Sequence, residues 1–292
     1  MKLGKWVYLD QNFVTAGKAR ISPFDRAFLF SHAAYEVTAF YNGKLIDFDG
    51  HLQRLERTLA ALDIPMPEQS LADLHGQPIE RNGLKEGLIY LQVSAGDYGH
   101  RDFYGPENFV PTLFMFAVDK QLINDAARDG IEAITLPDTR WARRDLKTTQ
   151  LLSQSLAYRK ARQAGATTAY MHEDGVITEA ASANIWIVTT AGKLVTRPLS
   201  EAILPGITRD AVIDLFSASS LRIEERLFTV DEVKSATETF TSSAGAIIAP
   251  VTKLDGIQIG NGQPGPITRR VQRAYYERMG ADIATAAPWI SS

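Results

Sequence analysis

A lysine that follows two arginines has the clearest potential for covalent chemistry in this sequence. It is Lys147, in the run Arg-Arg-Asp-Leu-Lys-Thr-Thr at residues 143–149. Nearby positive charge and exclusion of water both lower the affinity of a lysine for its proton. More of the side chain is then the free amine that attacks carbonyl groups. Taken alone, the run fits an ordinary solvated lysine better, so other features must decide.

Two small-residue segments have the composition of anion-binding backbone. Gly206 leads into a periodic helix expected over residues 207–217, and free N–H groups at such a start attract anions. The run Thr-Ser-Ser-Ala-Gly-Ala at 241–246 follows a strand and can form a nest of N–H groups. Helix capping by Thr208 and a tight turn at 241–246 explain the same residues without a ligand.

A carboxylate and an amide share a third segment, Thr-Glu-Ala-Ala-Ser-Ala-Asn at 178–184. Glu179 and Asn184 are polar groups among small residues, just before the apolar run 185–188. This arrangement is equally consistent with a polar site and with an exposed turn.

Several common chemistries are excluded by absent motifs. The sequence has no cysteine, which rules out disulfides, thiolate metal sites and cysteine nucleophiles. It has no phosphate-binding Gly-x-x-x-x-Gly-Lys-Ser/Thr, no Gly-x-Gly-x-x-Gly between a strand and a helix, and no Gly-x-Ser-x-Gly. The five histidines are scattered without metal-ligand spacing, so we expect no metal site. A nucleophile must then be serine, threonine or lysine.

The composition is that of a soluble globular protein. The 292 residues include 31 Lys and Arg against 34 Asp and Glu, a formal charge of −3, with 45% hydrophobic and 22% charged residues. The near-neutral balance argues against a nucleic-acid partner. No apolar run approaches the ~20 residues that span a bilayer, and the start lacks a signal-peptide core. We therefore expect a cytoplasmic protein without a membrane partner.

Hydrophobic periodicity predicts two mixed α/β domains. In the first half, we expect hairpins around 6–14 and 35–48, the second turning at Asn42-Gly43. Helices are expected after a cap at Asp49 and near 71–82, and strands near 88–93 and 112–118. The polar stretch 119–130 is the best linker. The predicted domains are therefore 1–119 and 131–292, joined by a linker at 120–130.

In the second half, strands and helices alternate. We expect strands near 131–136, 169–171, 185–189, 238–241 and 247–252, and helices near 148–164, 207–217 and 267–279. The order indicates a mixed α/β domain built around antiparallel or mixed strands, and this architecture has to position Lys147 and the segments described above.

Taken in order, these segments resemble the fold type IV pyridoxal-phosphate (PLP) aminotransferases. This group includes D-amino-acid transaminases, branched-chain aminotransferases, (R)-selective amine transaminases and aminodeoxychorismate lyase. The resemblance covers essentially the whole chain and is closest to the D-amino-acid transaminase branch. The segments that carry it are 24–30 (Phe-Asp-Arg-Ala-Phe-Leu-Phe), 35–37 (Tyr-Glu-Val), 51–55 (His-Leu-Gln-Arg-Leu), 145–148 (Asp-Leu-Lys-Thr), 176–184 (Val-Ile-Thr-Glu-Ala-Ala-Ser-Ala-Asn) and 204–209 (Leu-Pro-Gly-Ile-Thr-Arg).

The resemblance implies a role for individual residues. Lys147 matches the lysine that forms the internal aldimine with PLP and then moves the substrate's Cα proton. Glu179 matches the carboxylate that pairs with the protonated pyridine nitrogen, and Tyr35 matches a tyrosine near the substrate. The cofactor-binding positions implied are Arg54, Ile207, Thr208, Ser242 and Ser243 for the phosphate and its surroundings and Leu204 against the ring face.

The substrate loop departs from the family pattern. D-amino-acid transaminases grip the substrate carboxylate with a Pro-Arg-x-His-x-Phe-Pro loop, whereas residues 94–108 here place Arg101 at the arginine and Phe103 at the histidine position. A guanidinium suits bidentate carboxylate binding, and His100 is the substitute for the missing histidine. A pair between Arg101 and Asp102 at a loop tip is the alternative. Ser243 and Ala244 complete the expected substrate-binding residues.

The resemblance also implies the reaction and the assembly. We expect a ping-pong transaminase that moves an amino group between a D-amino acid and a 2-oxo acid such as 2-oxoglutarate or pyruvate. The alternatives are a branched-chain L-amino-acid or (R)-amine transaminase and a PLP lyase. The implied fold is a small N-terminal α/β domain and a larger C-terminal domain with a barrel-like β core. PLP is expected in the cleft between them, and a homodimer is expected to complete each active site.

Overall fold

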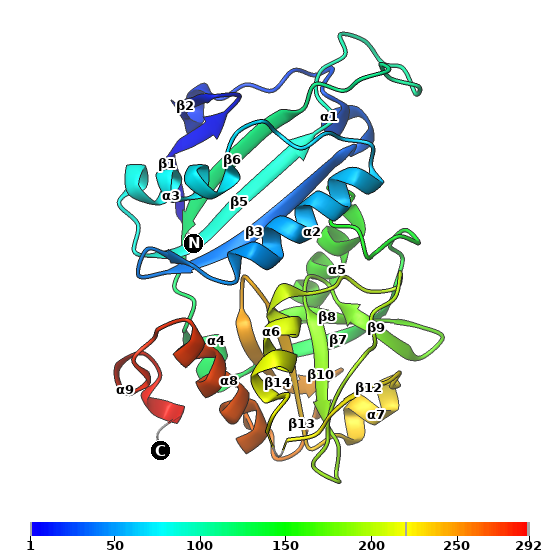
Figure 1. The fold of residues 1–292 in the computed structure, drawn as a ribbon. Helices are drawn as coiled ribbons and strands as arrows, with labels where there is room; N and C mark the ends of the chain where they lie inside the picture. Colours follow the sequence, from blue (N-terminus) through cyan, green and yellow to red (C-terminus); the bar gives the residue numbers. More distant parts are fainter. Residues whose placement is uncertain (1, 220, 291–292) are drawn as a thin grey trace. The chain divides into compact units, whose positions relative to one another are not determined.

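The computed structural model describes residues 2–219 and 221–290, and these form two compact units. Unit 1 runs as far as Leu122 and also contains Leu146–Gln150, while unit 2 contains Ile123–Asp145 and the described chain from Leu151 onward. Figure 1 shows the order of the elements along the chain. Each unit is described by itself below.

Unit 1 is built on an antiparallel sheet. Its six described strands lie in the order β2-β1-β6-β5-β3-β4. Figure 1 shows α2 running along β3 and α3 beside β1 and β6. The elements are β1 (Lys2–Leu9), β2 (Asn12–Thr15), a 3-10 turn (Ala16–Lys18), α1 (Arg26–Phe30), β3 (Ala33–Tyr41), β4 (Lys44–Leu45), α2 (Phe48–Ala61), α3 (Leu71–Asn82), β5 (Glu86–Ser94) and β6 (Thr112–Asp119).

Local sequence signals explain most of unit 1. Asn42 and Gly43 both have positive φ, 49° and 75°, as the predicted two-residue turn between β3 and β4 requires. The helix predicted at 71–82 is confirmed as α3, which Ser70 caps. Helix α2 begins two residues earlier than predicted, at Phe48, and its N-cap is Asp47 instead of Asp49. Leucines of α2 and α3 pack against the sheet to form the core of the unit.

Unit 2 is built on a mixed sheet, whose described strands number nine, with β15 paired to β14 outside the main order β12-β11-β10-β13-β14-β7-β8-β9. The elements are α4 (Asp125–Asp129), β7 (Ile131–Pro137), α5 (Leu152–Gln163), β8 (Thr168–Glu173), β9 (Val176–Ala180), β10 (Asn184–Val188), β11 (Leu194–Thr196), α6 (Ile207–Phe216), β12 (Ile223–Glu225), α7 (Val230–Ser235), β13 (Glu238–Ser243), β14 (Ile247–Leu254), β15 (Ile257–Gln258), α8 (Pro266–Arg278), α9 (Ile283–Ala286) and a 3-10 turn (Pro288–Ile290).

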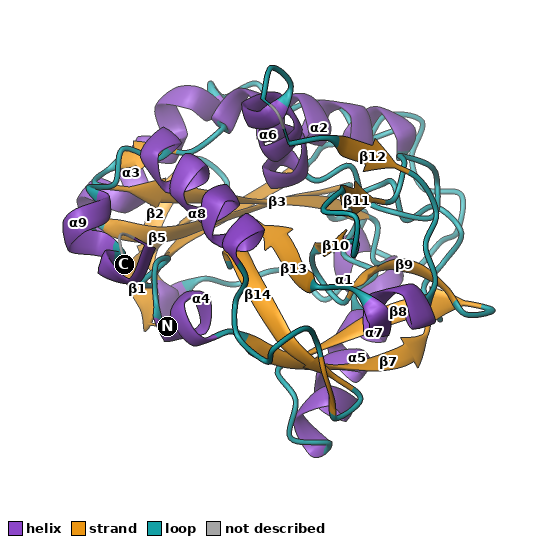
Figure 2. Ribbon diagram, turned by 90° about the horizontal axis from the view of Figure 1, so that it is seen from below, coloured by secondary structure: helices purple, strands orange, loops and turns teal. Residues whose placement is uncertain are grey.

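The unit 2 sheet curls into a half-barrel, which confirms the predicted barrel-like core (Figure 2). Strand β7 runs parallel to both β8 and β14, whereas β8-β9, β10-β13 and β13-β14 are antiparallel. Trp186 on β10 and Phe240 on β13 stack with ring centroids 5.7 Å apart. Both rings are buried, and their packing stabilises the middle of the sheet. Polar residues described below lie on the same two strands.

The structure differs from the sequence prediction around residues 120–130 and 148. The expected linker contains α4 and the buried side chains of Leu122 and Ile123, and the division between the units falls between these two residues. The helix expected from Thr148 begins at Leu152. Residues 147–149 instead pair with β3, which makes Leu146–Gln150 part of unit 1 although the predicted boundary put them in the second domain.

Over residues 2–219 and 221–290, no helix combines the length and the apolar character needed to cross a bilayer.

Candidate active site

Lys147 lies beside Tyr35 in unit 1. Its Nζ is 3.3 Å from the Tyr35 hydroxyl and 4.3 Å from the centre of the tyrosine ring. Backbone pairing produces this contact, because the Tyr35 N–H donates to the Lys147 carbonyl and the Thr149 N–H donates to the Ala33 carbonyl. The lysine is thus held at the edge of β3 and is only half-buried. An amine next to a hydroxyl is an arrangement suited to proton transfer.

A stack of aromatic rings holds Tyr35 in place. Its ring lies 5.5 Å from that of Tyr90 on β5, which in turn lies 4.9 Å from Phe116 on β6. Burial raises the pKa of Tyr90, and the Tyr90 hydroxyl donates to the side chain of Gln92. The row of rings fixes the direction of the Tyr35 hydroxyl toward the amine.

Arg54 forms a buried ion pair on the opposite face of β3, as expected because successive residues of a strand alternate in direction. Its Nε and Nη2 each lie 2.8 Å from the two carboxylate oxygens of Glu36. His51 Nδ1 lies 2.8 Å from one of these oxygens. Despite full burial, contact with Arg54 and His51 holds the pKa of Glu36 well below its usual value. The bidentate pair fixes the plane of the Arg54 guanidinium.

The buried His75, near this ion pair, leads us to expect that acid lowers the stability of the fold. Burial lowers the pKa of His75 from near 6.5 to about 4, so the folded state keeps it neutral while the unfolded chain takes up a proton. The free energy of unfolding should therefore fall by up to about 3 kcal/mol as the pH falls from about 6.5 to 4. Glu36, whose pKa is lowered, contributes its own loss only below the pKa of an unfolded glutamate. Thermal melting between pH 7 and 5 measures the effect.

The matched variants are His75→Gln and His100→Gln. The first removes the buried imidazole and should make the pH dependence of Tm shallower, with a remainder from His51, whose pKa burial also lowers. The second replaces an exposed histidine and should keep the wild-type slope. Equal slopes in His75→Gln and the wild type would refute the assignment of this acid sensitivity to His75.

The expected substrate-binding residues His100 and Arg101 lie in the loop between β5 and β6. The His100 ring contacts Tyr98, with centroids 4.6 Å apart. The exposed Arg101 guanidinium lies over two rings, 5.2 Å from the centre of Phe30 and 4.7 Å from that of Phe103. Within unit 1, the structure thus brings Lys147 to Tyr35. It also joins Lys147 to Arg54 through Thr58, whose hydroxyl accepts from the Lys147 N–H at 3.4 Å and donates to the Arg54 carbonyl at 2.9 Å. His100 and Arg101 lie in a separate cluster.

In unit 2, Glu179 lies on the buried strand β9, which removes the exposed-turn alternative for this segment. The residue is only 4% exposed. One carboxylate oxygen accepts a hydrogen bond from Arg140 Nη1. Arg140 also pairs with Asp138, 2.7 Å away, and Asp138 accepts from the Thr178 hydroxyl. Burial raises the pKa of Glu179, and Arg140 opposes this change.

The second Glu179 oxygen joins the strand to the start of α6. It accepts from the Leu204 N–H at 3.2 Å and from the Asn184 amide at 3.3 Å, and Asn184 also donates to the Leu204 carbonyl. A Cβ at Gly206 would lie 1.9 Å from Asn184 Oδ1, so only glycine fits there. Because this glycine is the N-cap of α6, no side chain caps the first turn at Ile207 and Thr208.

The small-residue segment lies at the end of β13, opposite β10. Asn184 and Ser242 are directly paired across the two strands. The Ser242 hydroxyl accepts from the indole N–H of Trp186 at 2.9 Å, and the Ser243 hydroxyl accepts from the Ala246 N–H at 3.2 Å. Ala244 follows in the turn to β14. Unit 2 thus gathers Glu179, Leu204, the start of α6 and Ser242 around Asn184.

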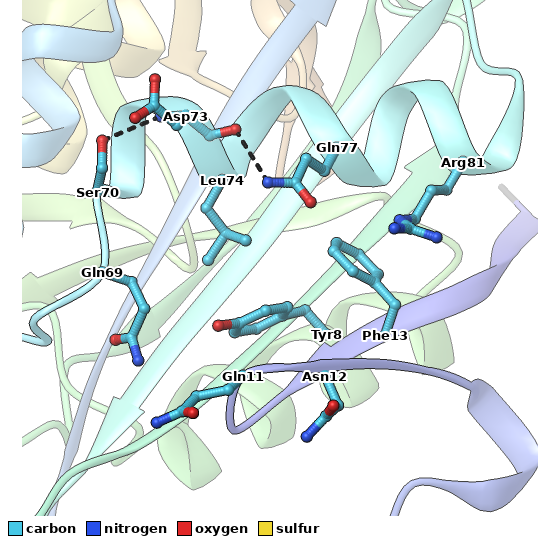
Figure 3. Close-up of a pocket in the computed structure, with 10 residues that line it drawn as sticks. All are labelled: Tyr8, Gln11, Asn12, Phe13, Gln69, Ser70, Asp73, Leu74, Gln77 and Arg81. Atoms are coloured by element: carbon cyan, nitrogen blue, oxygen red, sulfur yellow. Dashed lines mark hydrogen bonds between the residues drawn. The ribbon is translucent and has the colours of Figure 1, made fainter.

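A separate groove in unit 1 is shown in Figure 3. It is an open hollow of about 610 Å³ between α3 and the β1-β2 hairpin. It contains none of the residues predicted to bind a cofactor or substrate. Its lining residues are Tyr8, Gln11, Asn12, Phe13, Gln69, Ser70, Asp73, Leu74, Gln77 and Arg81. Nowhere in the described ranges do three or more His, Asp or Glu residues gather in a way that could hold a metal ion.

Comparison with known proteins identifies the family. The family model described as amino-transferase class IV matches residues 33–254, a range that includes every residue predicted above to bind the cofactor or the substrate. The chain belongs to the class IV aminotransferases. This confirms the predicted family and makes the chain a PLP-dependent aminotransferase.

Individual class IV aminotransferases are similar over almost the full length. D-alanine aminotransferase of Bacillus licheniformis is 35% identical over 86% of this chain and 88% of its own. That of Listeria monocytogenes serotype 1/2a is 32% identical over 94% of this chain and 96% of its own. Among solved structures, the branched-chain amino acid aminotransferase of Escherichia coli is 27% identical, with a TM-score of 0.83 over 94% of this chain and 93% of that one.

In this class IV aminotransferase, several side chains that position the predicted site residues are not among those predicted from the sequence. Glu36 and His51 orient Arg54, while Arg140 and Asp138 surround Glu179. The sequence marks Asn184 only as a polar residue near Glu179. One signal was available: Asp138 and Arg140 follow the predicted strand at 131–136, where charged residues at a strand end often line a site.

Proposed function

We propose that this enzyme moves an amino group between a D-amino acid and a 2-oxo acid, with PLP as its cofactor. The observation that carries the proposal is the Lys147 amine 3.3 Å from the Tyr35 hydroxyl. The identity to two D-alanine aminotransferases, 35% and 32%, supports a D-amino acid as the donor. The Arg101 guanidinium further supports a substrate that carries a carboxylate.

The residues present fit PLP in charge and in hydrogen-bonding capacity. In unit 1, Arg54 is a fixed cation suited to a phosphate and Lys147 is an amine suited to an aldehyde. In unit 2, the first turn of α6 has no side-chain cap, which suits its N–H groups and Thr208 to a phosphate. The buried Glu179 carboxylate suits a protonated pyridine nitrogen. Ser242, Ser243 and Leu204 are assigned to the surroundings of the cofactor.

In the proposed mechanism, each residue has one task. PLP, when bound, supplies a ring that stabilises the negative charge left on the substrate's Cα. Lys147 Nζ takes the Cα proton and returns it, while the Tyr35 hydroxyl orients the amine. Glu179 holds the proton on the pyridine nitrogen. Arg101 and the adjacent His100 bind and orient the substrate carboxylate, and Ser243 and Ala244 are assigned to substrate binding as well.

A donor screen tests the proposal. Purified enzyme with PLP is mixed with D-alanine, L-leucine or (R)-1-phenylethylamine, and conversion of the cofactor to its amino form is followed by absorbance. We expect conversion with D-alanine and pyruvate formation when 2-oxoglutarate is present. Conversion by L-leucine without any by D-amino acids would overturn the donor assignment, and pyruvate formation from aminodeoxychorismate without an amino acceptor would indicate a lyase.

A branched-chain L-amino-acid transaminase is the second candidate. The observation that favours it is the likeness to the Escherichia coli branched-chain enzyme, with a TM-score of 0.83. The L-leucine arm of the screen decides between the two.

We also propose a homodimer. Supporting it, unit 1 exposes several large apolar side chains near the loop that carries Arg101, among them Phe28 and Val110. A mass of one chain in gel filtration, together with full activity, would refute the dimer.

A further inference from the structure

Arg26, the first residue of α1, is a buried cation that the proposed mechanism does not use. It is only 5% exposed. Within the described ranges, no carboxylate lies at ion-pair distance from it. Its guanidinium lies instead between two rings, 4.6 Å from the centre of Phe30 and 5.4 Å from that of Phe109. A buried charge without polar partners is costly, so the loss of the hydrogen bonds of this guanidinium would be strongly unfavourable.

Those hydrogen bonds lead to the loop that carries Arg101. Arg26 Nη1 donates to the carbonyl of Asp102 at 2.6 Å, and Nη2 donates to the carbonyl of Phe103 at 3.3 Å. A planar guanidinium fork matches two consecutive carbonyl groups, and a lysine ammonium does not. Gly105, at φ +73°, lets the backbone pass so close that an added Cβ would lie 3.4 Å from Arg26 Cζ. The loop backbone is therefore bound directly after Arg101.

His32 holds the third side of the guanidinium. Arg26 Nε donates to His32 Nδ1 at 3.2 Å, and His32 Nε2 lies 2.8 Å from the Leu62 carbonyl. Since an arginine only donates and a carbonyl only accepts, a neutral imidazole with its proton on Nε2 satisfies both bonds. A chain of hydrogen bonds thus runs from the Leu62 carbonyl, at the end of α2, through His32 and Arg26 to the loop that carries Arg101.

We infer that Arg26 is a positioning residue that sets the direction of Arg101 toward the substrate carboxylate, and that His32 aligns Arg26 for this task. The inference rests on the proposed role of Arg101. Arg101 and Arg26 share the Phe30 ring, which lies 5.2 Å and 4.6 Å from their Cζ atoms. Loss of the Arg26 fork frees the backbone at residues 102–103, and with it the base of the Arg101 side chain.

A double-mutant cycle tests the inference. Steady-state kinetics are measured for Arg26→Met, Arg101→Met and the double variant, together with Arg26→Lys. We expect Arg26→Met to raise KM for D-alanine about tenfold with kcat within about twofold. In the Arg101→Met background, the same change should leave KM unaltered, because the residue through which it acts is gone. Arg26→Lys keeps the charge but not the fork, so its KM should also rise.

The matched control is Arg20→Met. Arg20 also donates to two carbonyls, those of Gly17 and Ala19, but it is exposed and contacts no predicted site residue. Its KM should equal that of the wild type. An equal rise in KM with and without Arg101, or a lower kcat at unchanged KM in Arg26→Met, would overturn the inference.

His32→Phe provides an independent variant should Arg26→Met not fold. It keeps a ring against Phe109 and removes the acceptor for Arg26 Nε. A raised KM supports the inference, and an unchanged KM overturns it. The donor preference is judged on the wild type alone: if it converts L-leucine and not D-alanine, the D-specific function fails, and the same cycle is measured with L-leucine.

Discussion

Replacement of Lys147 by alanine is expected to lower kcat by on the order of 10⁴-fold or more. The amine is proposed both to hold PLP covalently and to move the proton at the substrate's Cα, and no other described amine lies at hydrogen-bond distance from Tyr35. A second measurement is independent of turnover. After incubation with PLP and borohydride, the wild-type chain should gain the mass of one phosphopyridoxyl group, and the variant should gain none.

Lys160→Ala is the control for this experiment. Lys160 is an exposed lysine of α5, so its loss should change neither kcat nor the labelling. Turnover within tenfold of the wild type in Lys147→Ala, or labelling that persists in this variant, would show that another residue performs the chemistry.

Replacement of Glu179 by glutamine is expected to slow the half-reaction with D-alanine by about 10²- to 10³-fold. A neutral amide cannot hold the proposed proton on the pyridine nitrogen. The variant should still fold, because Arg140 keeps its pair with Asp138. Affinity for PLP should change by less than about threefold, since the phosphate contacts are assigned to other residues. Stopped-flow absorbance gives the rate, and titration with PLP gives the affinity.

Glu201→Gln is a matched change at an exposed glutamate near Arg143 and should leave both quantities unaltered. A half-reaction rate in Glu179→Gln equal to that of the wild type would remove Glu179 from the proposed mechanism. A large loss of PLP affinity at normal rate would instead assign it to cofactor binding.

The elements that follow local rules were predictable from the sequence. The Asn42-Gly43 turn and helix α3 each depend on residues that lie close together in the sequence. Both are confirmed. The start of α5 was not predictable in this way. Residues 147–149 have a helical pattern, but their backbone groups pair with β3, so that Lys147 bonds to a residue 112 positions away.

The same distinction applies to the candidate site. The residues named in advance lie in contiguous segments that resemble a family. The groups that hold them are joined only in three dimensions: Arg140 meets Glu179 across 39 positions, and Arg26 meets the 102–103 backbone across 76 and 77. A buried arginine has no local sequence pattern that separates it from an exposed one, because its partners come from distant strands and loops.

The placement of Leu146–Gln150 has a consequence for any attempt to divide the gene. A break between Leu122 and Ile123 separates the long segments of the two units, but it leaves these five residues on the wrong fragment. The first fragment then lacks the edge partner of β3 and its lysine, while the second carries them as an unpaired insertion. We therefore expect two co-expressed fragments to recover activity only on reassociation, and circular permutation at a surface turn to be the better route to new termini.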